Sequence, residues 1–547
     1  MKKYSLIGSV LFLILTIING SVYACTNFLV TKGASTDGST FITYTADSHT
    51  LYGELYFWPA ADHMPGAMLD VYEWDTHRWL CQIPQVPHTY NVVGNMNEHQ
   101  LSIGETTYGG RPELADSTGK IDYGSLIYIA LQRAKNSREA IKVMTQLVEE
   151  YGYCSEGESF SISDPNEVWI MEMIGKGPGN KGAVWVAVRI PDGYVSGHAN
   201  QARITNFPLN DTMNCYYSKD VISFARSKGY FKGSDAEFSF CDVYAPLDFD
   251  AARFCEARVW SLFNKVTKGM DKYVDYAKGE NLKNKMPLWV KPDKKISVYD
   301  VMNVMRDHYQ GTPLDMTKDW GAGPYSCPVR WRPMTFKVNG DKYFNERAIS
   351  TQQTGFSFVA QSRSFLPDGI GGLIWFGVDD NYTTVYSPMY TSIKSVPGSF
   401  AVGNGDMMVF SDSSAFWIFN QVSNFAYTRY KDMIKDIQPV QKELETGYID
   451  KISEIDKQAL ELYNQDPQIA IDFLTEYSLN AGKNTFNRWK QLYGYLFTKY
   501  MDGNVKFSVD GSRIPKVTQP GYGEDWYKEL VKETGERYKA KSSSSGH

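Results

Sequence analysis

The sequence predicts a layered α/β sandwich and disfavours a doubly wound parallel sheet. β-type segments come first, a helical stretch follows, and β-type segments then return, without the regular strand and helix alternation of a doubly wound sheet. A hydrophobic share of 43% with 22% charged residues is typical of globular proteins. A chain of 547 residues can also bury a large core and form more than one domain.

The first predicted strands lie between Thr26 and Asp47. Apolar and polar residues alternate there on both sides of turn-forming residues 37–39. Two further strands are predicted at residues 167–173 and 183–190. The glycine-rich segment 175–182 between them lacks the Gly-Lys-Ser/Thr ending of a phosphate-binding loop, so we interpret it as a hairpin turn.

Two helices are predicted between these pairs of strands. Residues 125–134 and 137–151 have apolar side chains at helical spacing. Asn136 and Glu139 resemble a capping box at the start of the second helix, and Gly152 is suited to end it.

The C-terminal half is predicted to return to strands and then to become helical. β-type runs occur at residues 355–361 and 371–378. The stretch 420–502 is mostly helical in pattern and rich in Lys and Glu, and the polar, Ser-rich residues 539–547 are expected to be a flexible tail.

The first 24 residues have the three-part layout of a secretory signal peptide. Lys2 and Lys3 precede the apolar stretch Leu6–Ile18, and small residues lead to Ala24 immediately before Cys25. We therefore expect residues 1–24 to be removed, with an uncleaved signal anchor as the alternative. We expect no membrane span after this processing.

Composition argues against several classes of partner and cofactor. The net charge of -6 and the absence of a basic stripe disfavour nucleic acid and anionic lipid as partners. The eight histidines form no zinc-binding pair of the H-E-x-x-H type, and we expect neither a metal nor an organic cofactor. Seven cysteines leave at least one unpaired thiol; the other six can form disulfides or be small buried residues.

Cys25 is the predicted chemical centre. Cleavage after Ala24 would give it a free α-amine with a pKa of about 7.7 to 8.0, which can act as general base toward a thiol of pKa about 8.5. Two alternatives remain open at this point. Cys25 can be an ordinary disulfide partner, or it can carry a lipid anchor on a surface binding protein, although Tyr23 and Val22 do not suit lipoprotein processing.

Several long segments resemble the C69 dipeptidase family, within the N-terminal-nucleophile hydrolases. The resemblance begins at Cys25 and samples most of the chain up to about Phe400. Its segments are CTNFLVTKGASTDGSTFITYTADS from Cys25, GNMNEHQLSIGETT from Gly94, SISDPNEVWIME from Ser161, WVAVRIPDGYVSGHANQARI from Trp185 and QSRSFLPDGIGGLIW from Gln361.

The resemblance implies a four-layer αββα sandwich and amide hydrolysis through an acyl-enzyme. It makes Cys25 the nucleophile, Asp47 a carboxylate that orients the α-amine, and Asn200 a donor to the oxyanion. It also implies that Arg363 lies near the thiol, where a cation would favour thiolate.

The resemblance implies three residues of the substrate site as well. Glu105 and Thr106 are expected to line it, with a substrate amine as a candidate partner. Tyr44 stands where family members commonly have arginine, and because tyrosine carries no fixed positive charge, thiol activation or substrate preference is expected to differ here.

The resulting hypothesis is a secreted or periplasmic cysteine-type dipeptidase that acts on small peptides. An amidase of the same superfamily, acting on acylated amino acids, β-lactams or bile-salt conjugates, is the first alternative, and the lipid-anchored binding protein is the second. A homo-oligomer is left open. The expected layout is a signal peptide at 1–24, a hydrolase domain at 25–420, a helical C-terminal region at 421–538 and a flexible tail at 539–547.

Overall fold

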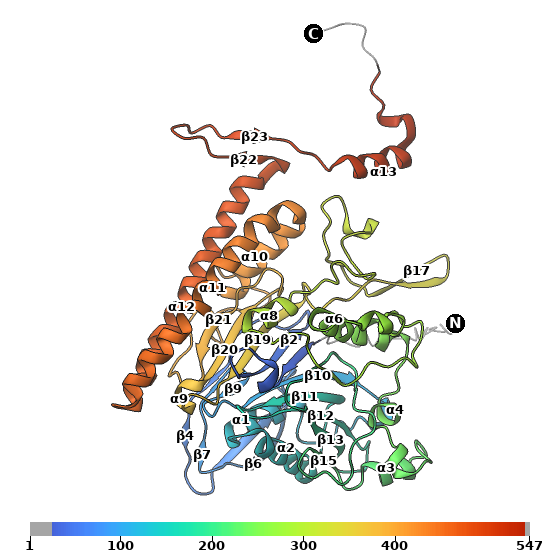
Figure 1. Cartoon of the computed structure of the whole chain (residues 1–547), viewed down its shortest axis with the longest axis vertical. Helices are drawn as coiled ribbons and strands as arrows, with labels where there is room; N and C mark the ends of the chain where they lie inside the picture. The colour runs from blue at the N-terminus through green and yellow to red at the C-terminus, as the bar shows by residue number, and fades with distance from the viewer. Residues whose placement is uncertain (1–24, 542–547) are drawn as a thin grey trace, which may run out of the picture.

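The computed structural model describes residues 25–541, so the predicted signal peptide and residues 542–547 lie outside the described residues. Within this range, two large antiparallel sheets pack face to face between layers of helices (Figure 1). The seven-stranded sheet has the order β16-β14-β1-β2-β19-β20-β21, and the eight-stranded sheet the order β15-β13-β12-β11-β10-β9-β8-β3. This arrangement confirms the predicted four-layer αββα sandwich.

The central strands of both sheets are buried along almost their whole length, because each sheet is covered on both faces. The seven-stranded sheet consists of β1 (Asn27–Val30), β2 (Thr40–Asp47), β14 (Val195–His198), β16 (Trp289–Val290), β19 (Thr354–Ser362), β20 (Gly372–Val378) and β21 (Ser387–Tyr390). The eight-stranded sheet consists of β3 (Phe57–Trp58), β8 (Val92–Val93), β9 (Met96–Asn97), β10 (Ser102–Gly109), β11 (Gly157–Ser163), β12 (Val168–Gly175), β13 (Ala183–Arg189) and β15 (Cys215–Tyr217).

The predicted strand pairs are confirmed. The segment between Thr26 and Asp47 forms the neighbouring antiparallel strands β1 and β2, with β1 in the interior of its sheet. β12 and β13 pair through the glycine-rich hairpin, and β19 pairs with β20. Runs of β-type residues bounded by turn residues were sufficient to place these strands.

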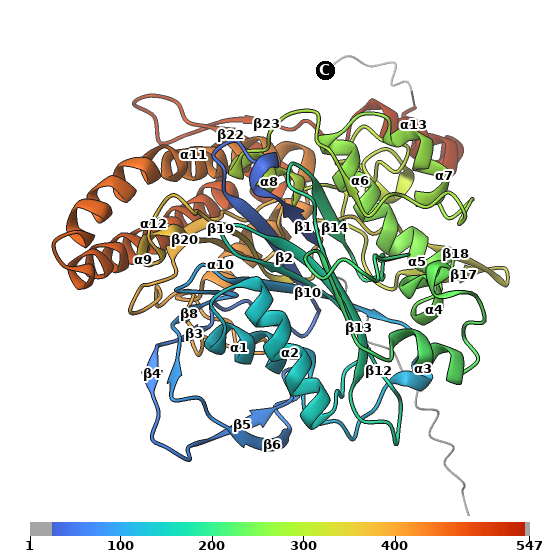
Figure 2. The ribbon, with the colours of Figure 1, turned by 60° about the horizontal axis from the view of Figure 1, so that its bottom comes forward.

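Helices form the two outer layers. On the eight-stranded sheet lie α1 (Tyr123–Arg133) and α2 (Ser137–Tyr151), which cross its strands in Figure 2. As predicted, Asn136 caps α2 by accepting from the Glu139 backbone N–H, and Gly152 ends it at φ 79°. On the seven-stranded sheet lie α6 (Ala257–Val266), α8 (Val298–Val304), α10 (Ala415–Tyr427), α11 (Tyr430–Tyr463) and α12 (Pro467–Tyr500).

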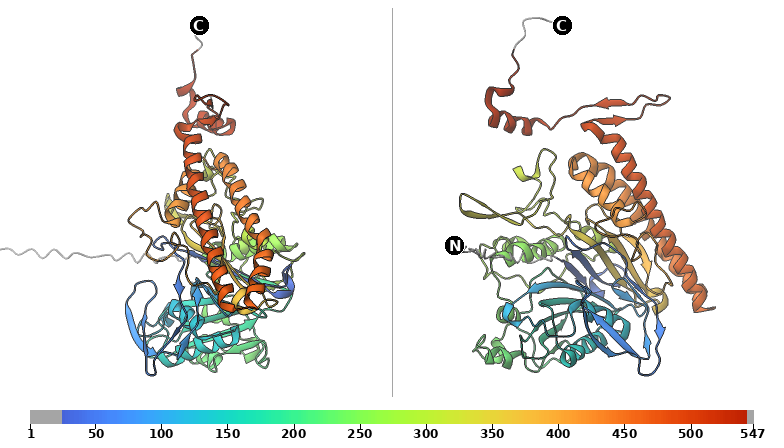
Figure 3. Two further views of the ribbon diagram at one scale, coloured as in Figure 1. Left: turned by 90° about the vertical axis from the view of Figure 1, so that its left-hand side faces the viewer. Right: turned by 180° about the vertical axis from the view of Figure 1, so that it is seen from behind.

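Smaller elements decorate this core. They are the two-stranded sheet of β4 (Ala61–Asp62) with β7 (His88–Thr89), the hairpins β5 (Met68–Tyr72) with β6 (Trp79–Pro84) and β17 (Thr335–Val338) with β18 (Asp341–Phe344), and the short helices α3 (Val221–Ser227), α4 (Phe240–Tyr244), α5 (Phe249–Ala251), α7 (Val274–Ala277) and α9 (Asp368–Gly371). After α12, the hairpin β22 (Val505–Phe507) and β23 (Lys516–Thr518) and helix α13 (Glu524–Thr534) extend away from the sandwich (Figure 3). Across residues 25–541, no helix combines the length and apolarity that crossing a membrane requires.

The helical C-terminal region packs directly on the seven-stranded sheet. α12 contacts β21, and α10 contacts β20, so these helices bury side chains in the same core as the strands. α10 spans the expected boundary between residues 420 and 421, and that boundary stays a prediction.

A buried ion pair joins the outer helices to this sheet. Arg363, just after β19, donates through Nη1 to Asp456 Oδ2 on α11 at 2.5 Å, and Tyr390 Oη donates to Asp456 Oδ1 at 2.7 Å. Arg363 also donates to the carbonyl oxygens of Ile370 and Gly371. The Arg363 side chain therefore holds α11 against the end of the sheet.

Replacement of Asp456 tests this joint. Asp456→Ala should lower the free energy of unfolding by about 3 to 5 kcal/mol, because it leaves the Arg363 guanidinium buried without its counter-charge. Urea denaturation followed by circular dichroism measures the change. Asp450→Ala, an exposed position on the same helix, is the matched control and should shift stability by less than about 0.5 kcal/mol. Equal stability of the two variants would contradict a role for the pair.

Candidate active site

Cys25 lies directly before β1, whose first residue is Asn27. The neighbouring Thr26 bridges to β2, where its N–H donates to Thr45 Oγ1 at 3.0 Å and its carbonyl accepts from the Thr45 N–H at 3.1 Å. The Cys25 side chain is only 4% exposed. The nucleophile predicted from sequence is thus fixed at the start of an interior strand of the sheet.

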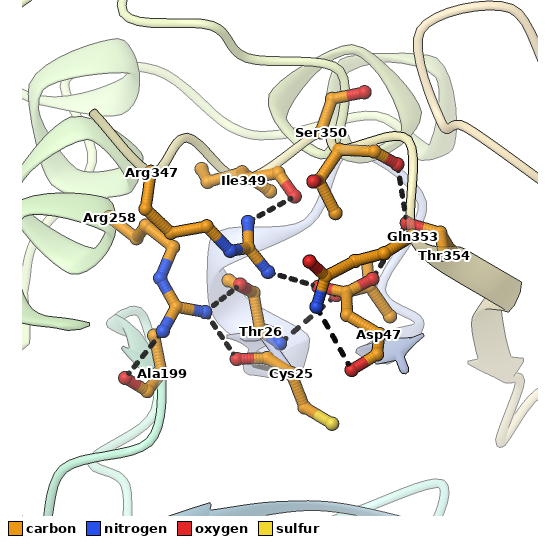
Figure 4. Close-up of polar contacts among 12 residues, drawn as sticks. Cys25, Thr26, Asp47, Ala199, Arg258, Arg347, Ile349, Ser350, Gln353 and Thr354 are labelled. Carbon is orange, nitrogen blue, oxygen red and sulfur yellow. Dashed lines mark hydrogen bonds and ion pairs between the residues drawn. The ribbon is translucent and has the colours of Figure 1, made fainter. Parts of the chain in front are cut away.

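Arg258 on α6 ties this strand to the adjacent β14 (Figure 4). Its Nη1 donates to the Cys25 carbonyl oxygen at 2.5 Å and to Thr26 Oγ1 at 2.7 Å. Its Nη2 donates to the Ala199 carbonyl oxygen at 3.1 Å and to Asn200 Oδ1 at 2.9 Å. Because an unpaired buried cation is costly, these acceptors fix the guanidinium and the two strand ends together.

Asp47, at the end of β2, is held beside a second buried arginine. Its Oδ2 accepts from Arg347 Nη2 at 2.6 Å and from Thr45 Oγ1 at 3.1 Å, and its Oδ1 accepts from Thr354 Oγ1 at 2.6 Å. Burial, followed by the charge of Arg347, lowers the pKa of Arg258. The predicted carboxylate therefore sits in a rigid, positively charged surrounding.

The thiol opens into a cavity of about 500 Å³. In Figure 4 its sulfur points away from the guanidinium groups of Arg258 and Arg347. The lining residues of this cavity, all within the described chain, include carboxyl groups but neither lysine nor arginine. The carboxyl groups are those of Asp47, Glu54, Asp75 and Glu105, and the aromatic walls are Tyr44, Tyr52, Tyr56, Phe57, Trp58, Trp74, Tyr123, Tyr128 and Phe356.

Two of the predicted substrate-site residues contact the thiol. The Cys25 Sγ lies 3.7 Å from Tyr44 Oη and 3.8 Å from Glu105 Oε1, and Tyr44 Oη donates to the same Glu105 oxygen at 2.5 Å. Burial raises the pKa of Glu105 to about 7. Burial, followed by the neighbouring Glu105, raises the pKa of Glu158 on β11 well above its usual range. Glu158 therefore keeps its proton and can donate it to Glu105.

This surrounding keeps Cys25 in the thiol form. Burial is the largest cause that raises its pKa, and the charges of Glu105 and Asp47 raise it further. A thiol is a weak nucleophile compared with a thiolate, so attack by Cys25 requires a base or a change in the charge around it.

Asn200 lies at the strand end next to that of Cys25. Asn27 of β1 pairs with His198 of β14, and beyond this pair Arg258 hydrogen-bonds to both the Cys25 carbonyl oxygen and Asn200 Oδ1. The backbone of Asn200 is left-handed, with φ 59°, and its Nδ2 donates to the Thr107 carbonyl oxygen at 2.6 Å. The same amide nitrogen carries a second hydrogen, which can be donated to an oxyanion.

Arg363 and Thr106 do not lie where the sequence placed them. Asp47 pairs with Thr354 at one end of β19, whereas Arg363 follows the other end, roughly 27 Å further along the strand. The prediction that Arg363 lies near the thiol is therefore wrong, and Arg363 pairs with α11 instead. Thr106 is not among the residues that line the cavity, because its Oγ1 hydrogen-bonds to His198 Nδ1 at 2.7 Å.

A second cavity, of about 450 Å³, lies on the arginine side of the site. Its lining includes Arg258, Arg347, Asn200 and Arg332, and it does not include Cys25. Burial, followed by Arg347, lowers the pKa of Arg332 to about 9. Across residues 25–541, no cluster of three or more His, Cys, Asp or Glu side chains is placed to hold a metal ion.

Sequence reasoning missed Arg258, Arg347 and Glu158. One signal was available for Arg258, which is a charged residue inside an apolar helical stretch and is therefore a candidate for a paired buried charge. Arg347 precedes β19 in an irregular segment, and no local pattern distinguishes it. Glu158 is an isolated carboxyl in a strand, where sequence does not show which partner it faces.

Glu105→Gln should speed alkylation of Cys25. The neutral amide removes a negative charge that raises the thiol pKa, so the thiol pKa should fall. The measurement is the rate of reaction with iodoacetamide between pH 6 and 10, using protein that begins at residue 25. Glu149→Gln makes the same charge change on an exposed turn of α2 and serves as control. An alkylation midpoint that does not move in Glu105→Gln would contradict the electrostatic account.

Comparison with known proteins identifies the family. The family model described as Peptidase family C69 matches residues 56–443. A probable dipeptidase of Salmonella dublin is 27% identical over 419 residues, which cover 72% of this chain and 86% of that protein. A probable dipeptidase of Latilactobacillus sakei is 26% identical over 470 residues, or 83% and 90% of the two chains. The chain therefore belongs to peptidase family C69 and is a hydrolase of peptide bonds.

Proposed function

We propose that this hydrolase is an exported dipeptidase whose nucleophile is Cys25 at the N-terminus of the mature chain. The observation that carries the proposal is the position of the Cys25 thiol, which opens into a cavity that Asp47 also lines, while Arg258 connects Cys25 to Asn200. The names of the relatives, probable dipeptidases, supply the substrate class. Small peptides are the expected partners.

Activation of the thiol depends on the α-amine. After cleavage behind Ala24, the amine of Cys25 would be a base of pKa about 7.7 to 8.0 on the residue that carries the sulfur. Asp47 is suited to orient it, because its carboxylate lines the same cavity and is itself fixed by Arg347. The raised pKa of the thiol makes such a built-in base necessary.

The proposed reaction proceeds through an acyl-enzyme. The α-amine takes the thiol proton, the sulfur attacks the carbonyl carbon, and an amide hydrogen of Asn200 stabilises the negative oxygen. The carbon–nitrogen bond then breaks, and the proton passes from the α-ammonium to the departing amine. Water, activated by the same amine, attacks the thioester and releases the first amino acid together with the free thiol.

Export follows from the same premise. Signal-peptide cleavage at residue 24 would both move the protein to the secreted or periplasmic space and create the catalytic amine. Mass analysis of the N-terminus of exported protein tests this step. A chain that starts at any residue other than Cys25, or a lipid-modified Cys25, would contradict it.

Removal of the thiol should abolish hydrolysis of dipeptides. Cys25→Ala is expected to lower kcat/KM by at least about 10⁴-fold, because the nucleophile is lost. Cys215→Ala is the matched control, since Cys215 is also buried but does not line the cavity. A chromatographic assay on a dipeptide panel measures both. Activity of Cys25→Ala near the control value would disprove the mechanism, whereas cleavage of acyl amides beside intact dipeptides would favour the amidase alternative.

An added residue before Cys25 should also impair the enzyme. One glycine in front of Cys25 converts the amine into an amide and places the new amine about 3.8 Å further along the chain. We expect kcat to fall by about 10²-fold or more, the usual contribution of general-base catalysis. The assay compares this protein with one that begins at Cys25; equal kcat values would show that the α-amine is not the base.

A further inference from the structure

The C-terminal arm, residues 501–541, stands apart from the sandwich. It contains the β22–β23 hairpin and α13, which extend away from the other elements in Figures 1 and 3. The arm contains no buried residue. Two of its contacts with the rest of the chain are the stacking of Trp526 on Trp320, with ring centroids 4.2 Å apart, and a hydrogen bond that Tyr325 Oη donates to the Gly521 carbonyl oxygen at 3.3 Å. Most of the arm surface is therefore left uncovered by the rest of the chain.

The arm exposes apolar side chains on elements that are weak when isolated. A two-stranded hairpin on its own is marginally stable in water, and a helix of 11 residues is too short to be stable alone. In the hairpin, Phe507 and Ile514 are 47% and 78% exposed. On α13, the exposed residues Tyr527, Leu530 and Val531 lie three and four positions apart and so form one apolar stripe. A partner that covered these side chains would stabilise both elements.

The two ends of the arm have opposite net charges. The hairpin region, residues 505–518, has a net charge of +2 from three basic residues and one acidic residue, which are Lys506, Arg513, Lys516 and Asp510. α13 has a net charge of -2 from four acidic and two basic residues, which are Glu524, Asp525, Glu529, Glu533, Lys528 and Lys532. Both lysines of α13 pair with acidic residues of the same helix. The three basic residues of the hairpin region form no ion pair within residues 25–541, so their charges are available to a partner.

A second copy of this chain offers the complementary charge at both ends. When two arms lie antiparallel, the basic hairpin of each lies against the acidic helix of the other, and the same contact is made twice about a two-fold axis. The exposed apolar side chains of the hairpin and of α13 then lie in the same interface. An anionic lipid surface fits less well, because it repels the acidic helix that carries the apolar stripe.

We propose that the arm joins two copies of this chain into a homodimer, in which the β22–β23 hairpin of each copy packs against α13 of the other. The apolar side chains supply the buried area, and the opposite net charges set the antiparallel orientation. No described lining residue of the Cys25 cavity comes from the arm, so the dimer does not depend on the proposed dipeptidase function.

Charge reversal tests the dimer without truncating the chain. The hairpin variant is Arg513→Glu with Lys516→Glu, and the helix variant is Glu529→Lys with Glu533→Lys. Each gives both ends of the arm the same sign, so each variant alone should associate at least about 30-fold more weakly than the unmodified protein. An equimolar mixture of the two variants restores opposite charges at both contacts and should dimerise to within about 3-fold of the unmodified protein. Sedimentation velocity over a dilution series, on protein that begins at residue 25, measures these affinities.

The matched control reverses two exposed charges on α11. Lys451→Glu with Lys457→Glu should leave the dimer unchanged, and circular dichroism should show that all variants are folded. Unmodified protein that sediments as a single chain throughout the dilution series would overturn the proposal. Dimers that persist in both arm variants, or a mixture that does not dimerise, would also overturn it. Binding of single chains to anionic lipid vesicles, without dimers, would assign the arm to a membrane surface instead.

Discussion

The structure around the nucleophile depends on one buried cation. Arg258 is enclosed by protein, and the carbonyl and side-chain oxygens that satisfy it belong to the ends of two neighbouring strands. Because leaving a buried guanidinium unpaired is costly, these strand ends are fixed relative to each other. This constraint sets the separation between Cys25 and Asn200. An acyl-transfer site requires such a fixed separation, because misalignment of the reacting groups lowers the reaction rate.

Charge is separated across the nucleophile. On one side, Arg347 pairs with Asp47 and Arg258 lies nearby, and on the other Glu105 and its neighbours line a cavity that has neither lysine nor arginine among its described lining residues. The side chains of Cys25, Arg258 and Arg347 are buried, so the charges around the sulfur are screened less than they would be at the surface. Burial, followed by the charges of Glu105 and Asp47, raises the pKa of the thiol, and this accounts for the need of a base at the site.

The two halves of the chain share this architecture. α10, α11 and α12 form an outer layer of the sandwich and are part of the core that the seven-stranded sheet builds. Arg363 joins α11 to the sheet through Asp456. A residue that resemblance assigned to the thiol thus serves packing, because β19 carries it to the end of the sheet opposite to Asp47. The match of Arg363 to a sequence motif therefore did not show at which end of β19 it lies, or how far it is from Cys25.

The sequence by itself determined the strands, the capped helix at residues 137–151, the four-layer fold and Cys25 as the residue at the predicted cleavage junction. These follow from local periodicity, helix capping and a family resemblance, which are all patterns of residues close together in the sequence. Only the tertiary structure revealed Arg258 and Arg347 beside the nucleophile and Glu158 behind Glu105. Their partners lie up to several hundred positions away in the chain, and no local pattern encodes which buried charges meet when sheets and helices pack.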